Sequence, residues 1–121
     1  LELMMVIVII GVLAAVAVPI YNSNVNLAKQ SEADGTLGSI RRQLIIYKGE
    51  HGRYPKEVHN NYVIGADWNT IKPGELNGKY FSDSSYTYRS TNTNVFRLIC
   101  DKGEIMERDR TLNELGDFGF D

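Results

Sequence analysis

The sequence predicts an α+β fold in which one long N-terminal α-helix packs against a small antiparallel β-sheet. The first 20 residues are almost entirely apolar, which is typical of a membrane-embedded or tightly packed helix. The following stretch keeps helical spacing of apolar residues to about residue 47. Short β-branched and aromatic runs separated by turn residues then indicate strands. With 121 residues, the chain is long enough for one small domain.

The amino-acid composition limits the classes of function that the chain can have. The formal net charge is -2, so the overall charge gives no reason to expect nucleic acid as a partner. Cys100 is the only cysteine, so these 121 residues hold no internal disulfide and no two-cysteine metal or redox motif. No serine, and not Cys100, stands in a sequence context typical of a catalytic nucleophile. We therefore predict no enzymatic activity.

The apolar run extends from Leu3 to Ile20 without a charged side chain. About 18 apolar residues is the lower edge of what spans a bilayer as a helix. We expect two parts in the chain. Residues 1–20 form a transmembrane or filament-core helix segment, and residues 21–121 form a globular head that includes the amphipathic half of the helix.

Three interpretations of this run differ in how they treat Glu2. A secretory signal peptide would be cleaved near the small residues 15–17, but it requires Lys or Arg ahead of the apolar core, where this chain has Glu2. A plain single-span anchor gains nothing from Glu2, because a carboxylate costs roughly 2.5–3.5 kcal/mol at the bilayer centre. The third interpretation is a helix that leaves the membrane and packs against copies of itself.

Small residues inside the run favour the third interpretation. Gly11, Ala14, Ala15 and Ala17 allow helix backbones to approach closely. Pro19 lacks a backbone donor and clashes with the preceding turn, so we expect it to kink or loosen the helix where the apolar segment ends. Dense packing between helices explains these residues better than anchoring alone.

Residues 2–19 read Glu-Leu-Met-Met-Val-Ile-Val-Ile-Ile-Gly-Val-Leu-Ala-Ala-Val-Ala-Val-Pro, with an acid, an apolar run, a glycine and a proline in that order. This segment resembles the N-terminal segment of mature type IV pilins and type II secretion pseudopilins. Residues 47–55, where a glycine is followed by Tyr-Pro, are similar to the junction after the long helix of those proteins. The two segments cover a little under half of the chain. Family members usually begin a few residues earlier, with a methylated phenylalanine, and this sequence starts at Leu1 without them.

The resemblance implies a pilin-like structural subunit that polymerises through its N-terminal helix into a type IV pilus filament. Its partners would be other copies of the chain, the bacterial inner membrane before assembly, and the pilus or type II secretion assembly machinery. The final location would be an extracellular pilus. The alternative is a pseudopilin in a periplasmic pseudopilus of a type II secretion system. A remoter alternative is a single-span membrane protein with a periplasmic binding head.

Three residues are candidates for a role in assembly: Glu2, Gly11 and Pro19. In a dry helix bundle the carboxylate of Glu2 is costly unless it is protonated or paired. The resemblance implies that it attracts a terminal amine and sets the axial register of an incoming subunit. Gly11 weakens the helix, and Pro19 cannot donate to the carbonyl of Ala15, so we expect regular hydrogen bonding to be lost between Gly11 and Pro19 in the filament.

The second half of the helix has two faces of different character. One face carries apolar residues at steps of 4, 3, 4 and 3, namely Ala33, Leu37, Ile40, Leu44 and Tyr47. Another carries Ala28, Ser31, Gly35 and Gly38, which is either a tolerated weakness or a place where another helix or a loop comes close. Pro55 and the glycines before it predict that the helix ends between about Lys48 and Gly52.

Beyond the helix, residues 56–75 show no clear period and are predicted to be a connecting loop, with Trp68 as a packing anchor. Strands are predicted over residues 85–90, 95–100 and 104–107, with turns at residues 91–94 and 101–103, which gives an antiparallel meander of three or so strands. Residues 111–121 have too little pattern to assign. Their apolar residues are expected to dock onto the head, namely Leu112, Leu115, Phe118 and Phe120.

Other potentially reactive side chains have less specific contexts. His51 and His59 are predicted to be solvated loop residues, and Cys100 a small buried residue of a strand. No cofactor is predicted, with calcium as the one open exception, because carboxylate oxygens are what Ca²⁺ needs. The acids concerned are Asp109, Glu114, Asp117 and Asp121, whose spacing matches no calcium motif, so solvated surface acids are favoured.

Overall fold

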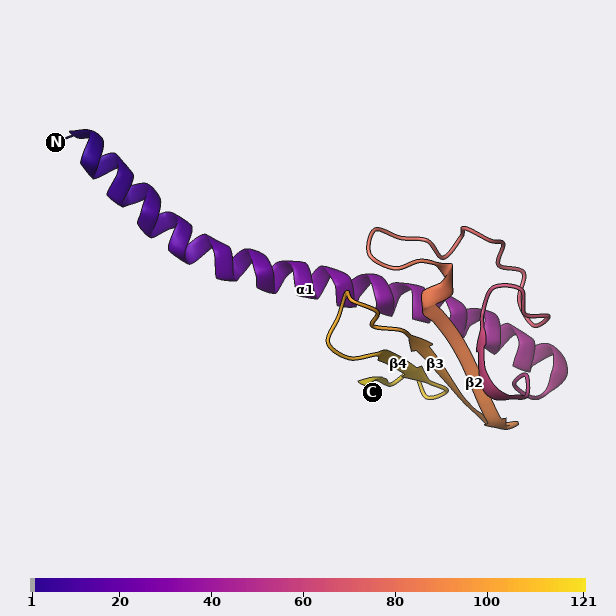
Figure 1. Cartoon of the computed structure of the whole chain (residues 1–121). Coiled ribbons are helices and arrows are strands. Elements are labelled where there is room, and N and C mark those ends of the chain that lie inside the picture. The colour runs from indigo at the N-terminus through magenta and orange to yellow at the C-terminus, as the bar shows by residue number, and fades with distance from the viewer. Residues whose placement is uncertain (1) are drawn as a thin grey trace.

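The fold consists of one very long helix and one five-stranded antiparallel sheet. A computed structural model describes residues 2–121; Leu1, the first residue of the predicted 1–20 segment, lies outside the described residues. The elements are α1 (Glu2–His51), β1 (Glu57–Tyr62), the short 3-10 helix η1 (Asp83–Ser85), β2 (Tyr86–Asn92), β3 (Val95–Cys100), β4 (Arg110–Asn113) and β5 (Phe118–Phe120). The strand order is β1-β2-β3-β4-β5. Figure 1 shows the sheet against the second half of α1, while the first half extends away from it. The predicted α+β fold class is confirmed.

The helix ends where the sequence predicts. Gly52 follows the last helical residue with φ of 75°, a left-handed conformation that glycine adopts without strain. Its backbone N–H donates to the carbonyl oxygen of Lys48 at 2.7 Å. This bond satisfies one of the carbonyl groups that a helix end leaves unpaired.

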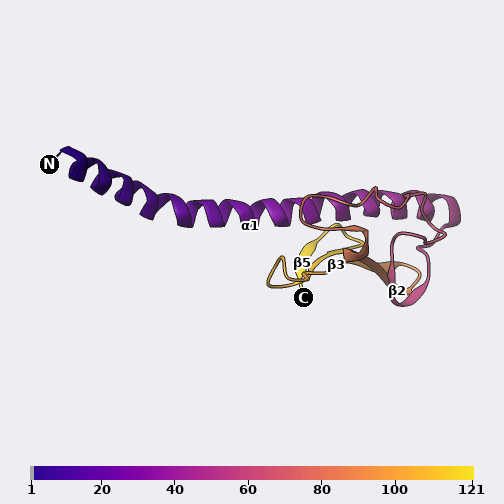
Figure 2. The ribbon, with the colours of Figure 1, turned by 45° about the horizontal axis from the view of Figure 1, so that its top comes forward.

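Pro19 lies inside α1, which is helical from Glu2 to His51 without a break. Figures 1 and 2 show that the N-terminal half of the helix curves gently. The predicted kink or loosening at Pro19 therefore takes the form of a curved, uninterrupted helix in the single subunit. A proline removes only one backbone hydrogen bond from the ladder, and neighbouring turns can absorb the bend.

The hydrophobic core lies between one face of α1 and the sheet. The predicted helix face is confirmed, because Ala33, Leu37, Ile40 and Leu44 are fully buried, with Tyr47 half-buried at its end. Paired residues of an antiparallel sheet share a face, so the registers that join β2, β3 and β4 bring one set of side chains to the helix. The strand residues of the core are Tyr86, Tyr88, Phe96, Leu98, Cys100 and Leu112.

The Tyr-Pro junction holds the end of the helix onto the sheet. Tyr54 is buried, and its ring meets that of Phe96 edge-on with centroids 4.7 Å apart. The carbonyl oxygen of Pro55 accepts a hydrogen bond from the buried hydroxyl of Tyr88 at 2.6 Å. This junction therefore fixes the direction in which the chain leaves the helix.

The predicted connecting loop over residues 56–75 was wrong at its start, because it contains the strand β1. This strand pairs with β2 at one edge of the sheet and is mostly exposed. A strand with both faces largely in water lacks the apolar–polar alternation that marks a half-buried strand. Its sequence, Glu-Val-His-Asn-Asn-Tyr, therefore gave no periodic signal.

The predicted strand over residues 104–107 was also wrong. Ile105 and Met106 both donate backbone N–H groups to the carbonyl oxygen of Lys102, which makes a turn. Both side chains are apolar because they pack half-buried against the core. In the sequence this short apolar run looked like a strand. The third strand of the meander is instead β4, and the predicted turn over residues 101–103 begins a longer loop rather than a hairpin.

The tail forms β4 and β5, which extend the sheet beyond β3. The expected docking is correct for Leu112, which is buried. It is wrong for Leu115, which is 73% exposed at the turn between the two strands, and only half correct for Phe118 and Phe120, which are 43% and 42% exposed. A three-residue edge strand has too little area to bury both rings.

Candidate functional site

The most distinctive surface of the molecule is the exposed apolar half of α1, residues 2–20. Its large side chains range in exposure from 51% at Val6 to 73% at Leu3. It belongs to the one helix among residues 2–121 that is long and apolar enough to cross a membrane. Figure 2 shows this half extending beyond the head, so the rest of the chain does not cover it. Burying a large apolar side chain stabilises a structure by about 1.5–3 kcal/mol, so this surface requires a lipid or protein partner.

The three predicted assembly residues all lie on this surface. Glu2 is exposed in the first turn of α1, and Pro19 lies about 25 Å further along at 1.5 Å per residue. Gly11 lies between them, with no atom within 4 Å of the position that a Cβ would take. The structure therefore does not bring the three together within one subunit. Their roles in assembly stay predictions.

The glycine face of the helix has no close neighbour within the chain. A Cβ on Gly35 or Gly38 would meet nothing within 4 Å. The hydroxyl of Ser39 donates to the carbonyl oxygen of Gly35 at 3.1 Å, which is a contact within the helix. No loop of the described chain packs there, and close approach by another subunit's helix stays a prediction.

A carboxylate on α1 holds the long loop before β2. Glu32 accepts hydrogen bonds from the backbone N–H groups of Lys79 at 2.5 Å, Tyr80 at 2.9 Å and Phe81 at 3.0 Å. A Cβ on Gly78 would overlap the same carboxylate, so only glycine fits there without a shift. Sequence reasoning missed this contact. The sequence signal that could have indicated this contact is Glu32 itself, an acidic residue next to the apolar face of the helix.

A second polar contact joins α1 to the end of the sheet. The guanidinium of Arg110 donates to both carboxylate oxygens of Asp34, at 2.6 and 3.1 Å. Arg110 is only 8% exposed, and its guanidinium lies over the rings of Phe118 and Phe120 at 5.1 and 4.5 Å. This pair sets the position of β4 and β5 on the helix. It was also missed, because its partners are far apart in sequence.

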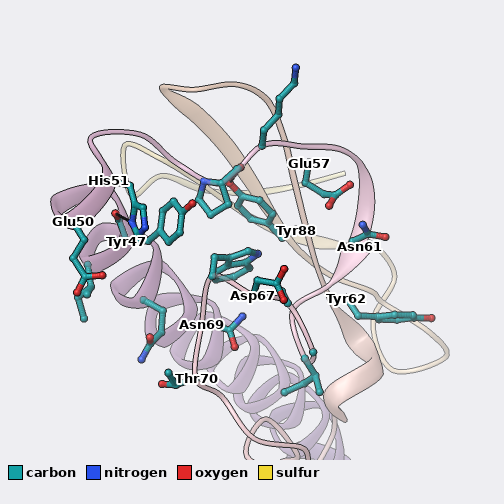
Figure 3. Close-up of a pocket in the computed structure, with 18 residues that line it drawn as sticks. Tyr47, Glu50, His51, Glu57, Asn61, Tyr62, Asp67, Asn69, Thr70 and Tyr88 are labelled. Carbon is teal, nitrogen blue, oxygen red and sulfur yellow. Dashed lines mark hydrogen bonds between the residues drawn. The ribbon is translucent and has the colours of Figure 1, made fainter.

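An open groove lies at the other end of the head, beside the last turns of α1. Its volume is about 1080 Å³, and its walls come from the helix end and from residues 55–70. Trp68 and Asp67 both line the groove, and Figure 3 shows Asp67 together with Tyr47 of the helix end and Tyr88 of the sheet. Trp68 packs against Tyr88 with ring centroids 4.9 Å apart, so its predicted role as a packing anchor is confirmed.

The histidines lie in regular elements rather than in loops, which corrects the prediction. His51 is the last residue of α1, and its ring stacks on that of Tyr47 with centroids 4.0 Å apart. The helix continues past Gly49 to His51, because the glycine that ends it is Gly52, three residues further along. His59 lies in β1. Both side chains are exposed, as expected.

Cys100 is buried and unbridged in β3, as predicted. Burial raises the pKa of its thiol to about 12, with the nearby Tyr86 hydroxyl opposing that rise. Burial also raises the pKa of Tyr88 to about 12, and that of Tyr86 above its usual value. A thiol that is protonated and buried is a poor nucleophile. Cys100 is therefore a packing residue.

Three of the four acids considered for calcium have different partners. Asp109 accepts a hydrogen bond from the backbone N–H of Lys102 at 2.8 Å, and Asp121 pairs with Arg97. Glu114 accepts from the backbone N–H of Phe96 at 3.4 Å. No group of three or more His, Cys, Asp or Glu side chains within residues 2–121 is arranged to hold a metal ion. Calcium binding therefore stays a prediction without a ligand cluster to support it.

Curated proteins similar to this chain are pilins, fimbrial proteins and a secretion-system protein. The type IV major pilin protein PilE1 of Neisseria gonorrhoeae is 35% identical over 82 residues, which is 68% of this chain and 46% of that protein. The fimbrial protein EcpC of Eikenella corrodens is 33% identical over 91 residues, covering 75% of this chain and 54% of that protein. The type II secretion system core protein G of Dickeya chrysanthemi is 42% identical over 55 residues, covering 46% of this chain and 36% of that protein.

The chain spans about half the length of the curated relatives it matches. No family model and no solved structure matches it. None of the relatives named above is described as an enzyme, and all belong to the group of proteins that the N-terminal segment resembles. The chain is therefore related, in sequence and in its long-helix and sheet architecture, to the type IV pilins and type II secretion pseudopilins.

Proposed function

We propose that this chain is a structural subunit that polymerises through its N-terminal helix into a type IV pilus filament. The exposed apolar half of α1 carries this proposal, because it is continuous with a folded head yet has no partner within the described chain. The bacterial inner membrane covers this surface before assembly, and the helices of neighbouring subunits cover it afterwards. The pilus assembly machinery moves the subunit from one state to the other, and the product is an extracellular pilus.

Head-to-tail assembly suits a subunit of this shape. A contact between two different surfaces of the same chain leaves a free surface at each end, so it generates an open helical polymer rather than a closed ring. Small residues along the apolar half, such as Gly11 and Ala14, let helix backbones approach closely, because no large side chain stands between them. Neither a soluble enzyme nor a simple anchor accounts for both features.

The alternative is a pseudopilin of a type II secretion system, and the similarity to core protein G of Dickeya chrysanthemi supports it. That match has the highest identity of the three described but covers the shortest stretch of this chain. Electron microscopy of material sheared from the cell surface separates the two functions. Long surface filaments that contain this chain support a pilus, whereas their absence at normal expression favours a periplasmic pseudopilus.

Replacing Glu2 tests the assembly mechanism directly. We expect Glu2→Ala to leave the head folded and the chain membrane-inserted, because Glu2 is exposed and far from the core. Filament yield should fall about tenfold or more, since a charge pair lost from an apolar interface is worth at least 1.4 kcal/mol. The measurement is a count of sheared filaments by electron microscopy at equal expression.

The matched control is Glu104→Ala, which removes one carboxylate from an exposed loop of the head. We expect this variant to assemble as the unmodified chain does. Normal filament numbers from Glu2→Ala would remove Glu2 from any role in assembly, and an equal loss in both variants would show that net charge, rather than position, is responsible.

A further inference from the structure

The groove at the C-terminal end of α1 is separate from the surface used for polymerisation. Its lining begins at Gln43 on the helix, whereas the apolar half ends at Ile20. At 1.5 Å per residue the two are about 35 Å apart along the helix. The chemistry of this groove can therefore be considered independently of filament formation.

Aromatic rings form the middle of the groove. Trp68 and Tyr47 both line it and are half-buried, so part of each ring remains accessible to a ligand. Tyr88 lies beneath Trp68 and holds it in place. An ammonium or guanidinium group within about 6 Å of such a ring is attracted by the negative charge of the ring face, most strongly with tryptophan. The rings alone would accept any flat or apolar ligand.

The charged groups of the groove select among these ligands. Glu50, Glu57 and Asp67 line it, and within residues 2–121 none of their carboxylates accepts a hydrogen bond or joins a salt bridge. Lys56 adds a single ammonium group to the lining. Asp67 directly precedes Trp68 in the sequence, and both residues line the groove. The groove thus combines aromatic faces with an excess of unpaired negative charge.

The amide of Asn69 is not available to a ligand. Its nitrogen donates to the carbonyl oxygen of Val63 at 2.9 Å, and its oxygen accepts from the backbone N–H of Ile71 at 3.0 Å. Among the groups of the groove that carry a full charge at neutral pH, three carboxylates therefore face one ammonium group. An anionic ligand would be repelled by three carboxylates, and an uncharged ligand would gain nothing from their charge.

We propose that this groove binds an organic cation through its ammonium group, which lies against Trp68 and is neutralised by Asp67 and Glu57. The aromatic ring supplies the contact surface, and the two carboxylates supply the charge. Because the groove is open to water, each contact is individually weak, and the dissociation constant is expected on the order of 1 mM. Raising the salt concentration should weaken binding, since exposed charges are screened.

The chain itself provides the probe for this test. Trp68 is its only tryptophan, so intrinsic tryptophan fluorescence reports on the groove without labelling. The full-length chain in uncharged detergent micelles is titrated with choline, with ethanolamine, and with 3,3-dimethylbutan-1-ol, the uncharged isostere of choline. We expect a saturable change with both cations and none with the alcohol over the same concentration range.

Three variants test which residues are responsible. Asp67→Asn and Glu57→Gln should each raise the dissociation constant at least about threefold, whereas Lys56→Gln should lower it, because it removes the one ammonium group that opposes a cation. Glu104→Gln, outside the groove, should leave it unchanged. Asp67 is exposed and Glu57 half-buried, so if Glu57→Gln fails to fold, Asp67→Asn and Lys56→Gln still decide the result.

The opposite outcomes would overturn the proposal. Equal responses to choline and to its uncharged isostere would show an apolar groove without selectivity for cations. An absence of saturation with both cations would show that the groove is not a cation site, as would variants of Asp67 and Lys56 that bind like the unmodified chain. None of these outcomes bears on filament formation, so a failure here is distinguishable from a failure of the proposed function.

Discussion

The two halves of α1 form one continuous helix but have opposite relationships with the rest of the chain. In the second half, Ala33, Leu37, Ile40 and Leu44 are fully buried against the sheet, while the polar residues beside them face water or hold loops. In the first half every residue from 2 to 20 is exposed on all sides of the helix. A helix gains most of its stability in water from packing one apolar face. The first half, which packs no face against its own chain, therefore suits an environment outside that chain.

High pH should separate the two halves most strongly. Cys100 and Tyr88 are in the core, and burial raises the pKa of each to about 12 from the usual values of 9.0 and 10.0. The unfolded chain therefore loses these protons at a lower pH than the folded chain, so the free energy of unfolding falls as pH rises from about 9 to 12. The head should unfold in this range, while the apolar half, which has only Glu2 as an ionisable side chain, stays helical in detergent.

Circular dichroism of the full chain in detergent micelles measures this difference. The near-ultraviolet signal of the packed aromatic residues should disappear between pH 9 and 12, with a substantial part of the far-ultraviolet helix signal retained. A head that stays folded past pH 12 would contradict the role assigned to burial. Simultaneous loss of the entire helix signal would show that the two halves are not independent.

Truncating one leucine in each half tests whether the two halves contribute differently to the stability of the head. Leu37→Ala removes a fully buried side chain and should lower the free energy of unfolding of the head by about 2–5 kcal/mol. Leu13→Ala, at a position 64% exposed, should change it by less than about 0.5 kcal/mol. Denaturant unfolding followed by Trp68 fluorescence measures both. A similar loss in both variants would mean that the first half also supports the head.

The contact between Asp34 and Arg110 tests how the second half holds the sheet. Asp34→Ala leaves a largely buried guanidinium without its carboxylate, and we expect a loss of about 2–3 kcal/mol. This is below the roughly 3–5 kcal/mol typical of a fully buried pair, because the Asp34 side chain is 26% exposed. Denaturant unfolding again gives the value.

A double-mutant cycle with Arg110→Met isolates the pair from other effects. Arg110→Met keeps packing volume against Phe118 and Phe120 without the charge. If the pair matters as described, Asp34→Ala should cost much less in the Arg110→Met background. Full additivity of the two changes would show that the contact contributes no coupling energy.

Sequence reasoning predicted the helix, its end and its buried face, because each depends on local spacing. Leu37 and Leu44 recur with the helical period, and Gly52 marks the end of the helix in any context. The apolar half was equally clear from composition. The structure of an element can be predicted from its own residues where it depends on local spacing and composition rather than on contacts with distant segments.

The parts that were wrong depend on contacts between distant segments. The strand β1 exists because β2 pairs with it, and nothing in its own residues shows a buried face. Ile105 and Met106 gave a strand pattern, but the backbone there closes a turn on Lys102. The carboxylate of Glu32 and the backbone of residues 79–81 are brought together only by the folded head. The cation groove, built from the helix end and a later loop, could not be predicted for the same reason.

The glycine face of α1 gives a smaller expected change in stability than Leu37 or Asp34, and it links the two halves directly. Gly35 and Gly38 lie in the second half, yet a Cβ on either would meet nothing within 4 Å, so this face has no close neighbour within the described chain. Each glycine costs a helix interior roughly 0.5–1 kcal/mol relative to alanine. Replacing both with leucine should therefore raise the stability of the single subunit by up to about 1–2 kcal/mol, because leucine is a good helix former.

If a neighbouring subunit's helix packs closely on Gly35 and Gly38, the same double replacement should reduce filament yield although it stabilises the subunit. Thermal unfolding in detergent and filament counts at equal expression measure the two effects, with Gly35→Ala and Gly38→Ala as the smaller replacement. A raised melting temperature with normal filaments would reject close packing between subunits and leave the glycines as a tolerated weakness. A lowered melting temperature would instead show that the face is packed within the subunit. Only stabilisation together with lost assembly would show that both halves of the helix keep a surface for another copy of the chain.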